Sequence, residues 1–147
     1  MRIIRATIDH LEALAPAFDA YRAFFTHVSG IADSRSFLRE RLSNADSVIL
    51  LAQDPDNTVG FLQLYPLFSS WYCKRIWFLS DLYVREEARG RGTASALVRQ
   101  ALAYATTTGA SSIMVEIPKT EPKLYEFYTR FGFSRDEVFD LFRWQTQ

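Results

Sequence analysis

Residues 81–102 read DLYVREEARGRGTASALVRQAL, and this stretch decides the fold. A long apolar run ends at Val84, and two glycines, Gly90 and Gly92, then enclose a turn. Apolar residues follow at the spacing of one helix face, at Ala94, Leu97, Val98, Ala101, Leu102 and Ala105. The stretch therefore predicts a strand, a glycine-rich turn and an amphipathic helix, in that order.

The start of this helix has the properties of an anion-binding site. The first turn of a helix presents unpaired N–H groups and the positive end of the helix dipole. Glycines let a phosphate approach the backbone, and Arg89 and Arg91 add positive charge. The pattern indicates a diphosphate ligand, with a plain solvated turn as the alternative. A dinucleotide-binding fold is a rival, but its G-x-G-x-x-G follows a first strand, whereas Gly90-x-Gly92 runs on to Ser95 after the fourth.

The rest of the chain predicts a mixed α/β domain. Apolar runs predict strands over residues 2–6, 48–52, 59–67, 76–84, 113–117 and 138–144. Helical spacing predicts helices over residues 11–25, 34–42 (with Ser34 as its cap), 94–105 and 122–131. The turn Asp-Pro-Asp-Asn at 54–57 joins two strands into a hairpin. The order β-α-α-β-β-β-α-β-α-β predicts one domain, 1–147, with parallel and antiparallel strand pairs.

The composition excludes several classes of protein. The 147 residues hold 17 Lys and Arg against 17 Asp and Glu, and this zero net charge argues against a nucleic-acid partner. No apolar run approaches the ~18 residues of a membrane span. The single cysteine, Cys73, cannot form an internal disulfide, and with only His10 and His27 beside it no metal site is expected. We expect no membrane partner and a cytoplasmic location.

Two motifs resemble those of a known family. Residues 89–94, RGRGTA, are similar to the acetyl-CoA signature Arg/Gln-x-x-Gly-x-Gly/Ala of the GCN5-related N-acetyltransferases (GNAT). Residues 127–133, FYTRFGF, are similar to a second GNAT motif, aromatic-Tyr-x-x-x-Gly-Phe. Residues 60–84 look most like the diamine and histone/polyamine branch. The resemblance implies the GNAT fold, whose mostly antiparallel central sheet splays into a V between its fourth and fifth strands.

The resemblance also implies an activity and a cofactor site. The chain would transfer acetyl from acetyl-CoA to a primary amine, a small polyamine-like amine or a lysine-type side chain. The backbone of Leu82, Tyr83 and Val84 would bind the pantetheine arm. The pyrophosphate would be held by Arg89, Gly90, Arg91, Gly92, Thr93 and Ala94, with Ser95 close by. Tyr128 would protonate the departing thiolate, although Tyr128 also fits a plain core stripe and Tyr125 competes with it.

The general base has more than one candidate in the sequence. The diamine branch carries a Glu-Asp pair where this chain has Ser80 and Asp81. Alternation along a strand predicts that Ser80 and Asp81 face opposite sides of the sheet. Asp81 is expected to be the base through water, to bind a cationic substrate, or to be structural. Glu116, near the end of the fifth sheet strand, is a second candidate base, with simple solvent exposure as the alternative.

The acceptor and the partners stay open at this stage. In this family the first two helices form the acceptor wall, which here offers Asp19, Tyr21, Arg22, Phe24, Phe25 and His27. The alternatives to catalysis are a non-catalytic acyl-CoA-binding sensor or interaction domain and a nucleotide-binding regulator. A homodimer is a further expectation, formed through the 138–144 strand and the aromatic turn at Trp71 and Tyr72.

Overall fold

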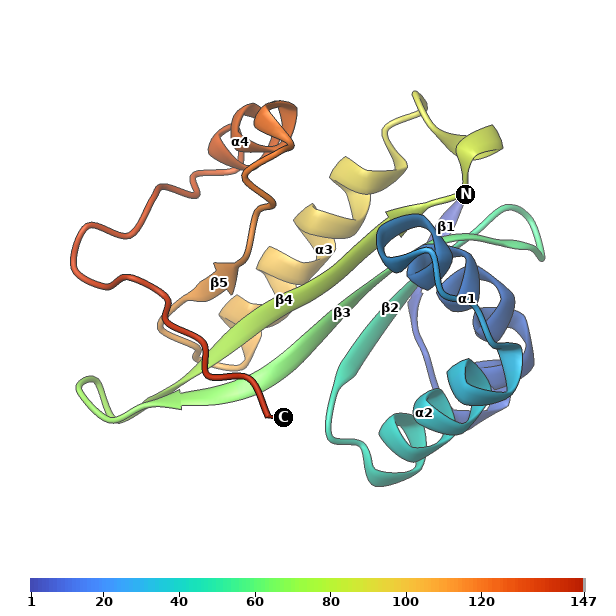
Figure 1. The fold of residues 1–147 in the computed structure, drawn as a ribbon, viewed down its shortest axis with the longest axis horizontal. Helices are drawn as coiled ribbons and strands as arrows, with labels where there is room; N and C mark the ends of the chain where they lie inside the picture. Colours follow the sequence, from blue (N-terminus) through green and yellow to red (C-terminus); the bar gives the residue numbers. More distant parts are fainter. Residues whose placement is uncertain (147) are drawn as a thin grey trace. The chain divides into compact units, whose positions relative to one another are not determined.

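The computed structural model describes residues 1–146 and divides the chain into two compact units, Met1–Glu116 and Ile117–Gln147. The first unit holds one sheet in the spatial order β1-β2-β3-β4-β5 (Figure 1). The strands are β1 (Arg2–Arg5), β2 (Val48–Gln53), β3 (Thr58–Ser69), β4 (Lys74–Val84) and β5 (Ile113–Val115). Neighbours are antiparallel except β4 and β5, which are parallel. The mixed, mostly antiparallel GNAT sheet is confirmed, and the single domain over 1–147 stays a prediction.

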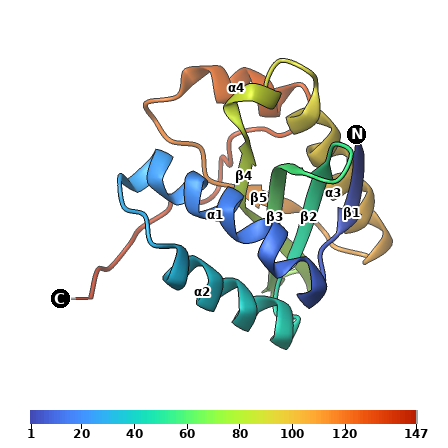
Figure 2. The same ribbon diagram turned by 90° about the vertical axis from the view of Figure 1, so that its right-hand side faces the viewer.

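Helices cover both faces of this sheet (Figure 2). On one face lie α1 (Leu11–Thr26) and α2 (Ile31–Asn44), and on the other lies α3 (Thr93–Thr107). The apolar residues that the sequence places on one face of α1 are packed in the core, where Leu14 and Phe18 lie in one cluster with Leu51 and Phe61. On α3 the buried positions are Thr93, Leu97, Val98, Ala101 and Ala105. None of the helices within residues 1–146 is both long and apolar enough to span a membrane.

The start of α2 differs from the sequence prediction. The helix begins at Ile31, before the expected cap Ser34, and Ser34 lies buried inside it. The Ser34 hydroxyl donates a hydrogen bond to Asp19 Oδ1 on α1 at 2.8 Å. The expected cap is therefore wrong, because the hydroxyl ties two helices together instead of closing a helix end.

The pairing between β4 and β5 is short. It runs from Trp77 with Ile113 to Leu79 with Val115, while β4 continues to Val84. On its other edge β4 pairs with β3 as far as Val84 with Gly60. Within residues 1–146, the end of β4 thus has one paired edge and one edge outside the sheet pairing, as a splay between the fourth and fifth strands requires. Backbone N–H and C=O groups on such an edge can bind an extended partner.

The second unit contains α4 (Pro122–Thr129) and no further strand among its described residues. The strand expected over 138–144 is therefore wrong. A strand exists only through hydrogen bonds to a neighbour, and the sheet described for residues 1–146 ends at β5. The Asp136 carboxylate instead accepts the N–H groups of Val138 and Phe139 at 2.8 and 2.7 Å, which forms a turn. The apolar side chains that follow are exposed, Phe142 by 93%.

Candidate active site

The Asp81 carboxylate in β4 is buried and held by three donors. Asp81 is 8% exposed. The Tyr21 hydroxyl on α1 donates to Oδ1 at 2.7 Å, and the Gln63 side-chain amide on β3 donates to Oδ2 at 2.7 Å. Burial raises the pKa of Asp81, and the hydrogen bonds from Tyr21, Gln63 and Ser80 act against this rise. A fixed carboxyl with a raised pKa is suited to accepting a proton.

Ser80 lies in a β-bulge beside this carboxylate. Gln63 pairs with Asp81, but the next residue of β3, Leu64, pairs with Leu79, so Ser80 is the extra residue of β4. The Ser80 hydroxyl donates to Asp81 Oδ1 at 3.3 Å. The prediction that Ser80 and Asp81 act on opposite faces is therefore wrong at this point, because a bulge interrupts the alternation of side chains.

An aromatic cluster leads from the carboxylate to the surface of α1. The Tyr21 ring lies 5.1 Å from the Phe25 ring and 5.5 Å from Phe61, measured between centroids. The Tyr83 ring, on β4, is 6.0 Å from Tyr21. Phe24 and Phe25 are 55% and 47% exposed. Rings of this kind attract ammonium groups through cation–π contacts, so the cluster fits a cationic amine.

Asp19, the other acid of the expected acceptor wall, is committed elsewhere. Its Oδ1 accepts the Gly30 N–H and the Ser34 hydroxyl, both at 2.8 Å, and lies 3.7 Å from the Arg22 guanidinium. These contacts, the Gly30 N–H first, lower the pKa of Asp19. Asp19 therefore anchors the start of α2, and Asp81 is the carboxylate associated with the aromatic cluster.

The loop before α3 has the geometry expected of an anion site. Gly90 and Gly92 have φ values of 76° and 79°, a left-handed conformation that glycine adopts without strain. Gly92 is the N-cap of α3, and its lack of a side chain leaves the first helix amides uncapped. A Cβ on either glycine would meet open space, so the loop surface can approach a ligand. The residues present fit a pyrophosphate at this helix start.

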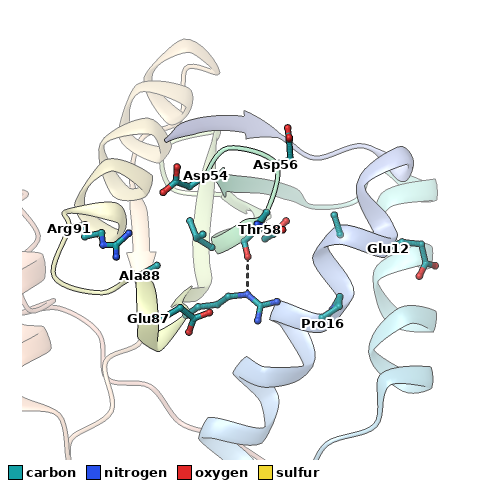
Figure 3. Close-up of a pocket in the computed structure, with 12 residues that line it drawn as sticks. Glu12, Pro16, Asp54, Asp56, Thr58, Glu87, Ala88 and Arg91 are labelled. Atoms are coloured by element: carbon teal, nitrogen blue, oxygen red, sulfur yellow. Dashed lines mark hydrogen bonds between the residues drawn. The ribbon is translucent and has the colours of Figure 1, made fainter.

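The two arginines of the loop are directed to different places. Arg89 donates from Nε to the Val84 carbonyl at 2.9 Å, and its guanidinium lies 5.4 Å from the Phe24 ring centre and 5.8 Å from Tyr83. Arg91 instead lines a cleft of about 640 Å³ (Figure 3). That cleft is bounded by the start of α1, the β2–β3 turn and the segment after β4. Arg89 therefore links the glycine loop before α3 to the aromatic cluster.

The second unit holds Tyr128 on α4. Tyr128 is buried, with its ring 5.1 Å from Phe127 and 5.4 Å from Phe133. Burial raises the pKa of Tyr128 to about 12, which keeps the hydroxyl protonated at neutral pH. The aromatic stripe predicted for this helix is thus formed. The Tyr128 hydroxyl is protonated, as a proton donor must be. Tyr125 is less buried and lies under the Arg135 guanidinium at 5.8 Å.

Glu116, the second candidate base, and the single cysteine lie apart from the residues described around Asp81. Glu116 is exposed just after β5. Cys73 is a free, exposed thiol in the hairpin turn between β3 and β4, with its Sγ 3.5 Å from the Ser70 carbonyl. The aromatic turn expected at Trp71 and Tyr72 is present.

The sequence interpretation missed Gln63. This residue is 0% exposed in the middle of β3, and its Oε1 accepts the Ser47 hydroxyl at 2.8 Å. The Ser47 contact turns the amide so that its NH₂ faces Asp81. A single glutamine inside the apolar run VGFLQLY was the available signal, since a buried amide requires polar partners.

Comparison with known proteins now decides the family. The profile described as the acetyltransferase (GNAT) family matches residues 10–133. The chain belongs to this family. It is 37% identical over 139 residues to YhfO of Bacillus subtilis (strain 168), an uncharacterized N-acetyltransferase, covering 95% of this chain and 93% of that one. A crystal structure of a probable acetyltransferase matches with a TM-score of 0.96 and 40% identity, covering 100% and 99% of the two chains.

A more distant relative is named for its acceptor. A thialysine N-epsilon-acetyltransferase of Sus scrofa is 28% identical over 74 residues, which are 50% of this chain and 43% of that one. Taken with the family, these similarities make this GNAT protein an acyltransferase that uses acetyl-CoA as its acetyl donor. They do not favour the non-catalytic sensor, and they do not single out the polyamine branch.

Proposed function

We propose that this acetyltransferase moves the acetyl group of acetyl-CoA to a primary amine, either a small polyamine-like amine or a lysine-type side chain. The buried Asp81 carboxylate at the end of an aromatic cluster carries the proposal. At pH 7 only about one alkylamine in 2,500 is neutral, a handicap of about 4.6 kcal/mol. A carboxylate that takes the amine proton relieves part of this handicap. The relative named for thialysine supports a lysine-type acceptor.

The residues would act in a direct, ternary-complex transfer. Acetyl-CoA supplies an activated thioester. The backbone of Leu82–Val84 binds its pantetheine arm, and the loop from Arg89 to Ser95 holds its pyrophosphate through N–H groups and positive charge. Strand backbone N–H groups stabilise the oxyanion. Asp81 receives the amine proton, and Tyr128 gives its hydroxyl proton to the sulfur as the C–S bond breaks.

The test is CoA release from acetyl-CoA with a panel of amines: spermidine, thialysine, a lysine-containing peptide, an aminoglycoside and a simple alkylamine. We expect turnover on one amine class, with kcat lowered about 100-fold or more in Tyr128→Phe. Tyr125→Phe is the matched control, one turn earlier on α4, and should retain kcat within about threefold. A lower kcat in Tyr125→Phe beside a wild-type kcat in Tyr128→Phe would indicate that Tyr125, not Tyr128, is the proton donor. Acetyl-CoA binding without turnover on any amine would favour the sensor.

Cys73 does not carry the acetyl group in this proposal. Its thiol is exposed in a hairpin turn, away in sequence from both motifs. Cys73→Ser should therefore retain the wild-type kcat, and it provides the background for assays that detect CoA with thiol reagents.

A single free cysteine is also usual for a protein of a reducing compartment, and we infer a cytoplasmic location on that basis.

We further propose that a second copy of the chain covers exposed aromatic residues of this one. Trp71 and Tyr72 at the β3–β4 turn are exposed, and so are Phe142 and Trp144 near the C-terminus. Exposed aromatic residues are enriched at interfaces. Light scattering should give twice the 17.0 kDa mass of one chain. A 17.0 kDa species at assay concentration would contradict the dimer.

A further inference from the structure

The Asp81 carboxylate is shielded from any acceptor by its own hydrogen-bond donors. Oδ2 faces the Gln63 amide, and Oδ1 faces the hydroxyls of Tyr21 and Ser80. With Asp81 only 8% exposed, a substrate amine has little direct access to either oxygen. The described hydrogen-bonded routes to the Asp81 carboxylate therefore run through these three donors.

The Gln63 side of the network is closed. Gln63 is fully buried, and the Ser47 hydroxyl holds its carbonyl oxygen at 2.8 Å. An amide does not accept and release protons near neutral pH, so Gln63 orients the carboxylate without conducting a proton. Burial raises the pKa of Tyr65 on β3, and the nearby charge of Asp81 raises the pKa of Tyr65 further. The side chains described as donating to Asp81 nevertheless remain Tyr21, Gln63 and Ser80.

Tyr21 is the hydroxyl best placed to connect Asp81 with the acceptor. Its hydrogen bond to Oδ1 is 2.7 Å, against 3.3 Å for Ser80. The Tyr21 ring is half-buried and contacts Phe25 at 5.1 Å, so it lies between the carboxylate and the exposed aromatic surface. A phenol hydroxyl can accept one hydrogen bond while it donates another, so it can take up a proton on one side and release one on the other.

We propose that Tyr21 is the acceptor-facing member of a proton relay to Asp81. As the amine nitrogen bonds to the acetyl carbon, its N–H proton passes to Tyr21 Oη, and the Tyr21 hydroxyl proton passes to Asp81 Oδ1. The N–H bond breaks and the C–N bond forms, while the C–S bond breaks with its electron pair on sulfur. Asp81 ends protonated and Tyr21 is restored. The relay rests on the proposed function, since it assumes acetyl transfer to an amine with Asp81 as the final base.

The experiment compares Tyr21→Phe with Tyr104→Phe and Asp81→Asn, using the best amine of the panel. Tyr104 is a half-buried tyrosine on α3 whose ring lies 5.5 Å from Trp77, so its variant controls for the loss of one hydroxyl. The readouts are kcat, the dissociation constant for acetyl-CoA, and a proton inventory, in which kcat is measured against the deuterium fraction of the solvent. A relay moves two protons together and gives a curved plot, whereas transfer of one proton gives a straight line.

We expect wild type and Tyr104→Phe to give the same kcat and the same curved plot. Tyr21→Phe should lower kcat about tenfold or more, straighten the plot and leave acetyl-CoA binding unchanged. A Tyr21→Phe protein with wild-type kcat and a curved plot, beside an inactive Asp81→Asn, overturns the relay alone. A larger loss in Ser80→Ala than in Tyr21→Phe overturns it in favour of a route through Ser80. A wild type that acetylates no amine, or an Asp81→Asn protein with full kcat, overturns the proposed function and the relay with it.

Discussion

The two halves of the candidate site, which meet at the end of β4, are built in different ways. The loop from Arg89 to Ser95 is continuous in sequence, and its geometry follows from two left-handed glycines and a helix start. The Asp81 network is assembled from four segments: Tyr21 on α1, Ser47 just before β2, Gln63 on β3 and Asp81 on β4. Tyr21 and Asp81 are 60 residues apart in sequence. In the proposed function, donor binding thus depends on local backbone geometry, and acceptor chemistry depends on packing.

Gly60→Ala should damage both halves together, because Gly60 pairs with Val84 at the end of β4. A Cβ at Gly60 would lie 2.7 Å from the Tyr83 carbonyl oxygen and 3.3 Å from Val84 Cα. These contacts are with backbone atoms, so the strands must separate, at a cost of about 1–3 kcal/mol. We expect urea unfolding to show this loss and assays to show weaker acetyl-CoA binding and lower kcat. Wild-type stability would contradict the close approach.

Gly92→Ala should affect the loop from Arg89 to Ser95 without affecting the Asp81 network. Alanine at φ 79° is strained by about 1–2 kcal/mol, and the same strain applies to Gly109→Ala at φ 70° beyond α3. Both variants should lose similar stability in urea. Only Gly92→Ala should weaken acetyl-CoA binding, by about tenfold, because only Gly92 lies at the start of α3, where we propose that the pyrophosphate binds. Equal affinities of the two variants for acetyl-CoA would contradict the proposal that this loop is part of the cofactor site.

The pH dependence of stability should separate Asp81 from Asp19. Burial raises the pKa of Asp81, so its contribution to folding is fully present below 3.8 and is lost as the pH rises through the raised value. The Gly30 N–H lowers the pKa of Asp19, so its contribution is present above 3.8 and is lost as the pH falls through the lowered value. Comparing wild type with Asp81→Asn and Asp19→Asn between pH 3 and 7 should give free-energy differences of opposite slope. Slopes of one sign would contradict the environment assigned to Asp81.

The sequence predicted the parts of the fold that local patterns control. The α3 spacing, the β2–β3 hairpin and the glycine loop are present as expected. The strand over 138–144 was wrong because β-propensity cannot supply a partner strand. The Ser34 cap was wrong because its hydroxyl binds Asp19 on another helix.

Asp81 was one of two candidate bases that the sequence offered, but its setting could not be predicted from the sequence. The bulge at Ser80 inserts one residue into β4, and no local pattern in LSDLYV marks that insertion. Gln63 and Tyr21 reach Asp81 only through the packing of β3 and α1 against β4. Single-sequence patterns do not contain such long-range contacts, so the orientation and raised pKa of Asp81 required the structure.

The most direct measurement is acetyl-CoA affinity and kcat for Asp81→Asn on the best amine of the panel. Asparagine keeps the size of the side chain and removes the proton acceptor. We predict that acetyl-CoA binds as in wild type while kcat falls about 100-fold or more. An Asp81→Asn protein whose kcat stays within about threefold of the wild-type value would contradict the proposal that Asp81 is the base. Loss of acetyl-CoA binding in this variant would contradict the division of the site into a donor loop and an acceptor network.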